Sequence, residues 1–554
     1  MLKYFIWIFI SIIISSGSAK GQLGSKKDIF TKKDSLRGMN GPFRQKWDVL
    51  HYDITVQPDF ESKTIKGNNR MRFYDNGANL MQVDLQEPMI LDSVVNNNGR
   101  YNFTRDGNVY WVMLRDTNRM YKIKPQENFV TLYFHGKPVE AKRPPWDGGW
   151  IWKKDQDGNP WMSVACQGLG ASVWYPCKDI QSDKPDSGAT LHIIVPDSLI
   201  AVGNGRMIST TKNNNSTTTY TWSVKNPINN YNIVPYIGKY SHFSEVYNGE
   251  KGKLDMDYWV LTYDLEKAKY QFKDAPKMMK AFEHWFGPYP FYEDGYKLVE
   301  APHLGMEHQS AIAYGNGFKM GYSGRDLSGT GWGLKWDFII VHESGHEWFA
   351  NNITTNDIAD MWVHEGFTNY SETLFTGYYF GQVAGNAYVQ GTRKLISNDI
   401  PIIGPYGVNK EGSGDMYYKA GNMLHIIRQI INDDEKFRSI LRGLNKDFYH
   451  QTVTTQQVET YLEKKSGKKL SKIFDQYLRT SKVPVLEYKL DGKKLLYRWS
   501  NVVEGFDMPL KISLDGLTFQ WIKVATSWKR LKVGKDYDQT KFLIDSNFYV
   551  TSKF

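Results

Sequence analysis

The spacing of apolar residues changes twice along the chain. From about residue 47, short segments alternate polar and apolar positions between Gly, Asn and Pro turns, a pattern that predicts β-strands. Near residue 266 the apolar positions begin to recur every three to four residues, which predicts helices. After Pro484 the alternation returns. The sequence therefore predicts an α+β multidomain protein with an N-terminal β domain, a mainly helical domain and a small β-sandwich-like domain. These three domains are expected at residues 45–240, 241–482 and 483–554.

The chain begins with an export-like segment, MLKYFIWIFISIIISSGSAKGQ. Lys3 precedes an apolar run from Tyr4 to Ile14, and small residues follow as far as Ala19. This order predicts a secretory signal peptide over residues 1–19, and the run is too short to span a bilayer. A buried strand or an uncleaved anchor is the alternative. We expect an exported protein, periplasmic or extracellular, with no stable membrane insertion after signal cleavage.

Composition and charge narrow the class of protein. Aromatic residues make up 15% of the 554 residues, which favours well-filled interiors over disorder. The net charge of +10 is spread along the chain without a basic block of five or more, so no nucleic-acid partner is predicted. Cys166 and Cys177 are the only cysteines. They can pair in an oxidising compartment or remain as two buried thiols, because sequence spacing does not fix the Cα separation.

Candidate chemistry is concentrated between residues 342 and 365, HESGHEWFANNITTNDIADMWVHE. One helical turn separates His342 from His346, so both imidazoles lie on one face, about 6 Å apart. Glu343 lies one step round the helix, where a general base can face a water molecule. Glu365 follows after an 18-residue interval and can supply a third ligand from another helix. Three ligands leave one position free, which predicts one catalytic Zn²⁺ per chain. Two histidines that satisfy each other in a buried helix are the alternative.

The same segment resembles a known family. HESGHEWFANNIT is similar to the HExxHxWFxNxxT motif of the zinc aminopeptidases that include aminopeptidase N and leukotriene hydrolase. DMWVHEGFTNYSE is similar to their WLNEGFAxYxE motif, with Glu365 at the third-ligand position. WDVLHYDITV and the later VGNG resemble the β-saddle domain of that family. The resemblance covers most of the chain and implies an N-terminal β-saddle followed by a thermolysin-like, mainly helical catalytic domain.

Further site residues follow only from the resemblance. LGMEH is similar to the end of the family's GxMEN motif, which implies substrate binding by Gly305, Met306 and Glu307. YYKAGNML is similar to YxKGxxxL and implies a catalytic role for Tyr417, which would donate to the developing oxyanion. ACQGLGASVWYPCKD places Gln167 at the glutamine that helps to hold the substrate amine. Glu307 would pair with the free α-ammonium of the substrate, so that the peptide bond after the first residue is the one cleaved.

Three residues depart from the family pattern. His308 stands where the family has Asn, which leaves open how the substrate strand is held, and His364 replaces Asn beside Glu365. Gly345 is expected inside the zinc helix, where glycine costs about 1 kcal/mol relative to Ala. The large helical C-terminal domain of many members has no counterpart in this sequence. The site is therefore expected to be more open, or to be closed by self-association.

The sequence therefore predicts a zinc-dependent aminopeptidase that hydrolyses the N-terminal peptide bond of peptides with a free N-terminus by means of a metal-activated water. A thermolysin-type zinc endopeptidase is one alternative, and Glu307 and Gln167 argue against it. A catalytically silent peptide-binding module is the other, and the full set of zinc-site residues argues against it. The side-chain preference at the cleaved residue, the oligomeric state and any second activity are not determined by the sequence.

Overall fold

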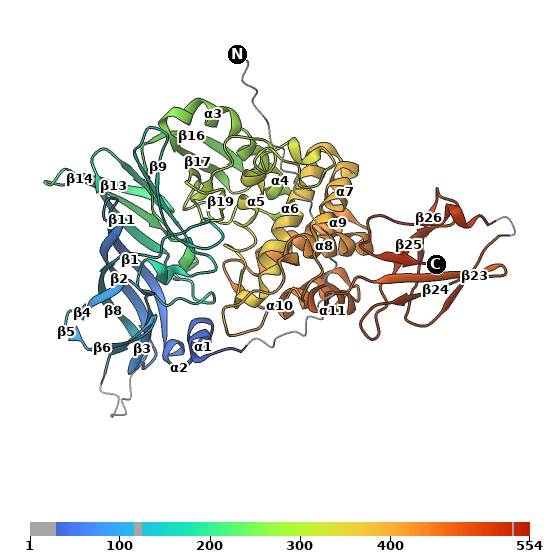
Figure 1. Ribbon diagram of the computed structural model, residues 1–554, viewed down its shortest axis with the longest axis horizontal. Helices are drawn as coiled ribbons and strands as arrows, with labels where there is room; N and C mark the ends of the chain where they lie inside the picture. Colours follow the sequence, from blue (N-terminus) through green and yellow to red (C-terminus); the bar gives the residue numbers. More distant parts are fainter. Residues whose placement is uncertain (1–28, 116–123, 535–536) are drawn as a thin grey trace, which may run out of the picture.

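The computed structural model describes residues 29–115, 124–534 and 537–554. The signal peptide expected at residues 1–19 lies outside these ranges. A β-rich part, a helical part and a small C-terminal β part follow one another from blue to red across the molecule (Figure 1). The predicted α+β multidomain fold class is thus confirmed. No helix within the described ranges has both the length and the apolar character needed to cross a bilayer.

An eight-stranded sheet dominates the N-terminal part. Its order is β13-β14-β11-β1-β2-β8-β4-β5. β1 (Trp47–Asp59) alternates buried and more exposed residues, because one face packs on the core and the other faces solvent. β1 pairs antiparallel with β2 (Thr64–Asp75) and parallel with β11 (Ala189–Pro196). The other strands are β4 (Ile90–Asn96), β5 (Gly99–Tyr101), β8 (Gln126–Gly136), β13 (Arg206–Lys212) and β14 (Thr217–Val224).

Two smaller sheets complete this part. A four-stranded sheet has the order β12-β15-β10-β9, and a three-stranded sheet has the order β3-β7-β6. Their strands are β3 (Leu80–Asp84), β6 (Phe103–Asp106), β7 (Val109–Met113), β9 (Gly149–Lys154), β10 (Pro160–Ala165), β12 (Ile200–Val202) and β15 (Tyr236–Gly238). Gln167 lies two residues after the end of β10, so the four-stranded sheet positions it. Cys166 and Cys177 are both buried free thiols.

A mixed five-stranded sheet opens the helical part. Its order is β16-β17-β18-β20-β19, with β18 parallel to both of its neighbours. The strands are β16 (Tyr240–Gly249), β17 (Gly252–Leu261), β18 (Tyr296–Glu300), β19 (Gly305–Met306) and β20 (Ile312–Tyr314). β19 is an edge strand, so the Gly305–Met306 segment is paired on one side only within the described chain.

The helices pack against this sheet and form the large core. They are α3 (Leu265–Gln271), α4 (Asp274–Phe286), α5 (Phe338–Gly345), α6 (Trp362–Phe380), α7 (Gln382–Gly391), α8 (Tyr418–Ile431), α9 (Asp434–Asp447), α10 (Thr455–Ser466) and α11 (Ser471–Arg479). Every residue of α5 is buried, which suits its largely apolar sequence. Its N-cap is Asp337, whose side chain accepts hydrogen bonds from the backbone N–H groups of Ile339 and Ile340.

Gly345 ends α5 instead of lying inside it, and His346 is the C-cap residue. The expected cost of an interior glycine therefore does not apply at this position. The glycine has a packing role, because a Cβ there would lie 2.7 Å from Ser371 Oγ and 3.1 Å from Thr368 Cγ2 on α6. The close approach of α5 and α6 brings the two halves of the predicted zinc motif together.

The C-terminal part consists of two small sheets, ordered β27-β24-β23-β29 and β26-β25-β28. Their strands are β23 (Val485–Asp491), β24 (Lys494–Ser500), β25 (Leu510–Ser513), β26 (Phe519–Ile522), β27 (Lys529–Lys532), β28 (Leu543–Ile544) and β29 (Thr551–Lys553). Buried Leu486 and Trp499 of this part belong to the same hydrophobic cluster as Phe474 of α11. The C-terminal part therefore shares one continuous core with the helices.

Candidate active site

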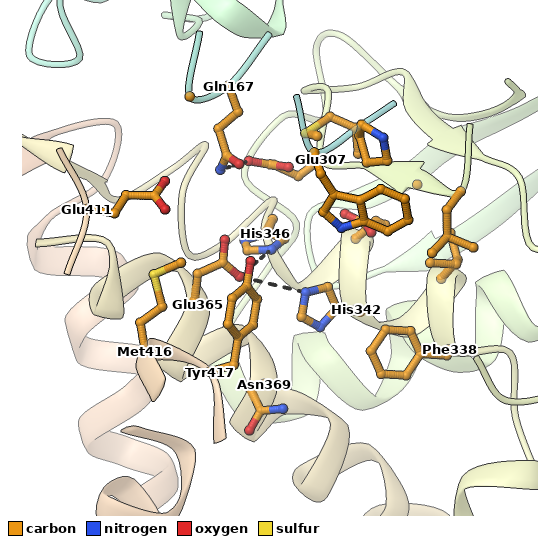
Figure 2. A pocket seen from close by; sticks show the side chains of 18 of the residues that line it. Gln167, Glu307, Phe338, His342, His346, Glu365, Asn369, Glu411, Met416 and Tyr417 are labelled. Atoms are coloured by element: carbon orange, nitrogen blue, oxygen red, sulfur yellow. Dashed lines mark hydrogen bonds and ion pairs between the residues drawn. The ribbon is translucent and has the colours of Figure 1, made fainter. Parts of the chain in front are cut away.

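A cavity of about 640 Å³ contains every residue that the sequence predicted for the site. Figure 2 shows Gln167 and Glu307 on one side of His342, His346 and Glu365, with Tyr417 close to the same three residues. The residues that line the cavity include Gln167, Gly305, Met306, Glu307, Phe338, His342, Glu343, His346, Glu365, Glu372, Glu411, Tyr417 and Tyr418. Segments from the β-rich part and from four stretches of the helical part thus meet at one place.

His342, His346 and Glu365 have the geometry of a metal-ligand set. Their ligand atoms all lie within 4.8 Å of one another. Glu365 Oε2 is 3.4 Å from His346 Nε2 and 3.8 Å from His342 Nε2, close to the separation of about 3.3 Å between donors around tetrahedral zinc. Glu365 Oε2 is buried and accepts no hydrogen bond within the described residues. A buried carboxylate oxygen without a donor, facing two imidazole nitrogens, fits a bound cation.

The charge of the three ligands favours the same conclusion. Burial raises the pKa of the Glu365 carboxyl, but the adjacent His346 and His342 rings outweigh burial and lower it. Burial lowers the pKa of His346, and the Glu365 carboxylate reverses this effect and raises it to about 10. Positive charge is therefore stabilised at the centre of the group. Glu365 also lies in the first turn of α6, where the helix dipole favours an anion.

Glu372 is a site residue that the sequence analysis did not identify. Its Oε1 atom is 2.8 Å from His342 Nδ1, and its Oε2 atom accepts a hydrogen bond of 2.7 Å from Tyr388 Oη. This contact leaves His342 Nε2 facing Glu365 and fixes the orientation of the ring. Glu372 follows Glu365 by seven residues, or two helical turns, so the two acids share one face of α6. That spacing was a usable signal in the sequence.

Glu343 projects from α5 into the cavity beside the ligands. Burial raises its pKa to about 7, against the opposing effect of His342 and His346. A carboxylate with a pKa near neutrality suits a general base. Gly305 explains how Glu343 gains its space, because a Cβ at Gly305 would lie 2.6 Å from Glu343 Oε1. Because Gly305 has no side chain, the Glu343 carboxylate can lie against the edge strand β19.

Glu307 is a buried acid held by two neutral donors. Gln167 Nε2 donates to Glu307 Oε1 over 2.6 Å, and Tyr231 Oη donates to the same atom over 2.9 Å. Burial raises the pKa of Glu307, and His346 opposes that rise. Since Gln167 donates through its nitrogen, its amide oxygen remains available to accept from a ligand. Tyr231 comes from a buried 3₁₀ turn at Asn230–Asn232 that carried no recognisable motif.

Tyr417 and its neighbour Tyr418 both line the cavity, but in different ways. The Tyr417 ring stacks on the His342 ring, with centroids 6.1 Å apart and planes at 26°. Tyr417 is also the residue before α8, so its ring leaves the helix end toward the ligands (Figure 2). Burial raises the pKa of Tyr417 well above its usual value, and the nearby carboxylates act in the same direction. Tyr417 is therefore a neutral hydrogen-bond donor.

The two unexpected histidines have structural partners. The His308 ring is completely buried, and its Nδ1 atom lies against Tyr236 Oη. His364 Nε2 accepts a hydrogen bond of 2.9 Å from the backbone N–H of Thr355, and burial lowers the pKa of this ring to about 3. Both rings are neutral side chains that tie segments of the site together.

A fold with an HExxH helix, a glutamate from the next helix and a buried acid at a strand edge defines a zinc-metallopeptidase class of protein. Comparison with known proteins gives the family. The description "Peptidase family M1 domain" matches residues 270–477. Residues 270–477 thus match the peptidase family M1 domain, and the resemblance drawn from the sequence motifs is confirmed.

Individual relatives are distant. Leukotriene A-4 hydrolase of Xenopus laevis is 23% identical over 401 residues, which cover 68% of this chain and 60% of that protein. Tricorn protease-interacting factor F2 of Thermoplasma volcanium is 20% identical over 349 residues, covering 60% of this chain and 42% of that protein. The chain thus spans less than two thirds of the length of either relative.

Solved structures share the fold. A mutant M1 zinc metallopeptidase from Deinococcus radiodurans, bound to a Tyr-Ser-Ala substrate, gives a TM-score of 0.66 at 18% identity. The match covers 80% of this chain and 97% of that one. Another structure of the enzyme from the same organism gives a TM-score of 0.66 at 20% identity, covering 79% and 95%. At these identities the likeness concerns the fold alone.

Proposed function

We propose that this chain is a zinc-dependent aminopeptidase that removes the N-terminal residue of peptides. The observation that carries the proposal is the buried Glu307 carboxylate. It lies in the same cavity as the ligand set, and its oxygen is within 4.8 Å of ligand atoms of both Glu343 and His346. An α-ammonium paired with Glu307 would leave room for only one residue before the reacting carbonyl. The cut would therefore fall after the first residue.

His342, His346 and Glu365 would hold the zinc ion. When bound, zinc supplies Lewis-acid polarisation of a carbonyl and makes a water molecule more acidic. Glu343 would accept the proton of the attacking water and pass it to the leaving amine. Burial raises the pKa of the Glu343 carboxyl, which makes the carboxylate a better proton acceptor. Tyr417 would donate its phenol hydrogen to the developing oxyanion.

The amine site follows from the donors around Glu307. Tyr231 and Gln167 fill one side of its Oε1 atom and leave the carboxylate otherwise directed into the cavity. The Gln167 amide oxygen would accept from the same ammonium. The unpaired side of β19 would pair with the extended backbone of the substrate, as peptides commonly pair with sheet edges.

The test compares free and N-acetylated versions of one peptide on wild type, Glu343→Gln and Glu307→Gln. Wild type should cleave only the free peptide, in a chelator-sensitive manner. Glu343→Gln should lose at least about a thousandfold in kcat while retaining zinc, because it loses the proton acceptor. Glu307→Gln should mainly weaken the preference for the free N-terminus. Near-normal turnover by Glu343→Gln would contradict the base assignment.

The two rival functions give different results in the same assay. A thermolysin-type endopeptidase would cleave the acetylated peptide as fast as the free one. A silent peptide-binding module would bind peptide and zinc without turnover. Export is a separate part of the proposal, and it rests on the order of basic, apolar and small residues in positions 1–19. N-terminal sequencing of the secreted protein would detect cleavage near Ala19, and an intact Met1 in that fraction would contradict it.

A further inference from the structure

The cavity contains one more acid than the proposed reaction uses. Four of its glutamates have roles: Glu365 as a ligand, Glu343 as the base, Glu307 at the amine and Glu372 behind His342. The fifth is Glu411, from the loop before α8. No hydrogen bond or ion pair engages its side chain within the described parts of the chain. A carboxylate that faces a substrate cavity without a partner is a candidate for substrate recognition.

Glu411 lies at the amine end of the cavity. Figure 2 shows its carboxylate directed into the cavity on the side of Gln167, with Phe338 on the opposite side of the ligands. A hydrogen bond connects the two walls, because Asn409 Nδ2 donates to the Gly168 carbonyl over 3.1 Å. The loop that carries Glu411 is thus attached to the segment that carries Gln167.

The Glu411 loop is anchored to neighbouring segments. Gly407 N donates to Asp357 Oδ2 over 2.7 Å, and Tyr406 Oη donates to Asp360 Oδ1 over 2.6 Å. The backbone packs so closely that a Cβ at Gly412 would lie 2.0 Å from the Ile402 carbonyl oxygen. A carboxylate on such a loop needs little ordering when it binds a ligand, so its contribution to affinity is retained.

The surroundings of Glu411 favour a positive charge beside its carboxylate. Burial and, to a lesser extent, the Glu365 and Glu307 carboxylates together raise its pKa to about 7. The neighbouring Lys410 is exposed, and its Nζ atom lies 5.9 Å from the centre of the Phe30 ring. A cation brought in by a substrate would therefore relieve both the desolvation of Glu411 and its repulsion by the other acids.

We propose that Glu411 selects peptides whose N-terminal residue is Arg or Lys, by pairing with the cationic side chain. This proposal rests on the aminopeptidase function proposed above. Glu307 and Gln167 would hold the α-ammonium, so the side chain of the same residue would start beside the amine and extend along the wall that carries Glu411. A guanidinium or ammonium would form a charge-assisted hydrogen bond there. A neutral side chain of equal shape would leave the carboxylate desolvated and unpaired.

The test uses arginine and its neutral isostere citrulline as amino-acyl fluorogenic amides. Wild type should show a kcat/KM for the arginyl amide at least about tenfold above that for the citrullinyl amide, as expected for one buried charged contact. In Glu411→Gln this ratio should fall to within about twofold of unity. Glu504→Gln, which neutralises an exposed acid of the C-terminal part, is the matched control and should keep the wild-type ratio.

Several outcomes overturn the proposal. A wild-type ratio near unity does so without any variant. An unchanged ratio in Glu411→Gln also refutes it. If Glu411→Gln lowers kcat/KM equally for arginyl and leucyl amides, Glu411 binds the α-ammonium instead of the side chain, and the proposed side-chain role is refuted.

Calorimetry with arginine amide and citrulline amide separates this proposal from the aminopeptidase function, since binding needs no turnover. If wild type prefers arginine amide, Glu411→Gln does not, and neither amide is hydrolysed, the selectivity is supported while the proposed function fails. If leucyl amide is hydrolysed but arginine amide has no advantage in either assay, the function stands and the selectivity is refuted.

Discussion

Replacement of Glu372 offers a direct test of the proposed zinc site. The carboxylate accepts from His342 over 2.8 Å and from Tyr388 over 2.7 Å, and both atoms of the first contact are buried. Partners of this kind typically contribute 10- to 100-fold to metal affinity, or about 1.4 to 2.7 kcal/mol. In Glu372→Gln the amide oxygen can still accept from His342, and the Tyr388 hydroxyl can turn to accept from the new amide nitrogen. This variant loses the charge but keeps the hydrogen bond.

We therefore expect a loss of about tenfold in zinc affinity for Glu372→Gln. For Glu372→Ala, which removes both the charge and the hydrogen bond to His342, we expect a loss of about 100-fold. The assay is zinc competition with a chromophoric chelator, with circular dichroism to confirm folding. Tyr388→Phe is the control, because it retains the carboxylate, and its zinc affinity should change by less than about threefold. Most of the activity should return at saturating zinc. Folded Glu372→Gln and Glu372→Ala proteins that both bind zinc within about twofold of wild type would refute the reasoning.

Three further predictions concern packing, titration and thiols. Gly345→Ala should destabilise the fold by about 1 to 3 kcal/mol, because the new methyl group would lie too close to Ser371. Adding Ser371→Ala should recover part of the lost stability. Urea midpoints that show no recovery in the double variant would contradict the packing argument. Burial lowers the pKa of Lys184 to about 7 in the folded chain, whereas an unfolded lysine titrates near 10.4. Between these two pH values the unfolded chain binds more protons than the folded chain. The free energy of unfolding therefore rises with pH across that window. Lys184→Met should reduce the gain in urea midpoint between about pH 7 and pH 9, and an equal gain in both proteins would exclude Lys184 as its source. Cys166 and Cys177 should react with a thiol reagent only after unfolding, because burial raises the pKa of both; one rapidly labelled thiol in the native protein would be inconsistent with this structure.

Local sequence patterns determined the part of this protein that depends on regular geometry. The four-residue spacing of His342 and His346 places both rings on one face of a helix. The alternation of apolar residues predicts a half-buried strand such as β1. The family motifs added Glu307, Tyr417 and Gln167 as candidates, and the structure brings all of them into one cavity. The seven-residue interval from Glu365 to Glu372 could have been used in the same way.

Tertiary structure alone decided which distant segments meet. Gln167 and Glu307 are 140 residues apart in the chain, yet their side chains form a hydrogen bond of 2.6 Å. Glu411 reaches the same cavity from a loop without a recognisable pattern, and Gly345 proves to be a point of contact between α5 and α6 instead of an interior weakness. The physical reason is that short-range periodicity records only which face of an element is apolar. The partner of that face, and the loops carried with it, are selected by the packing of the whole core.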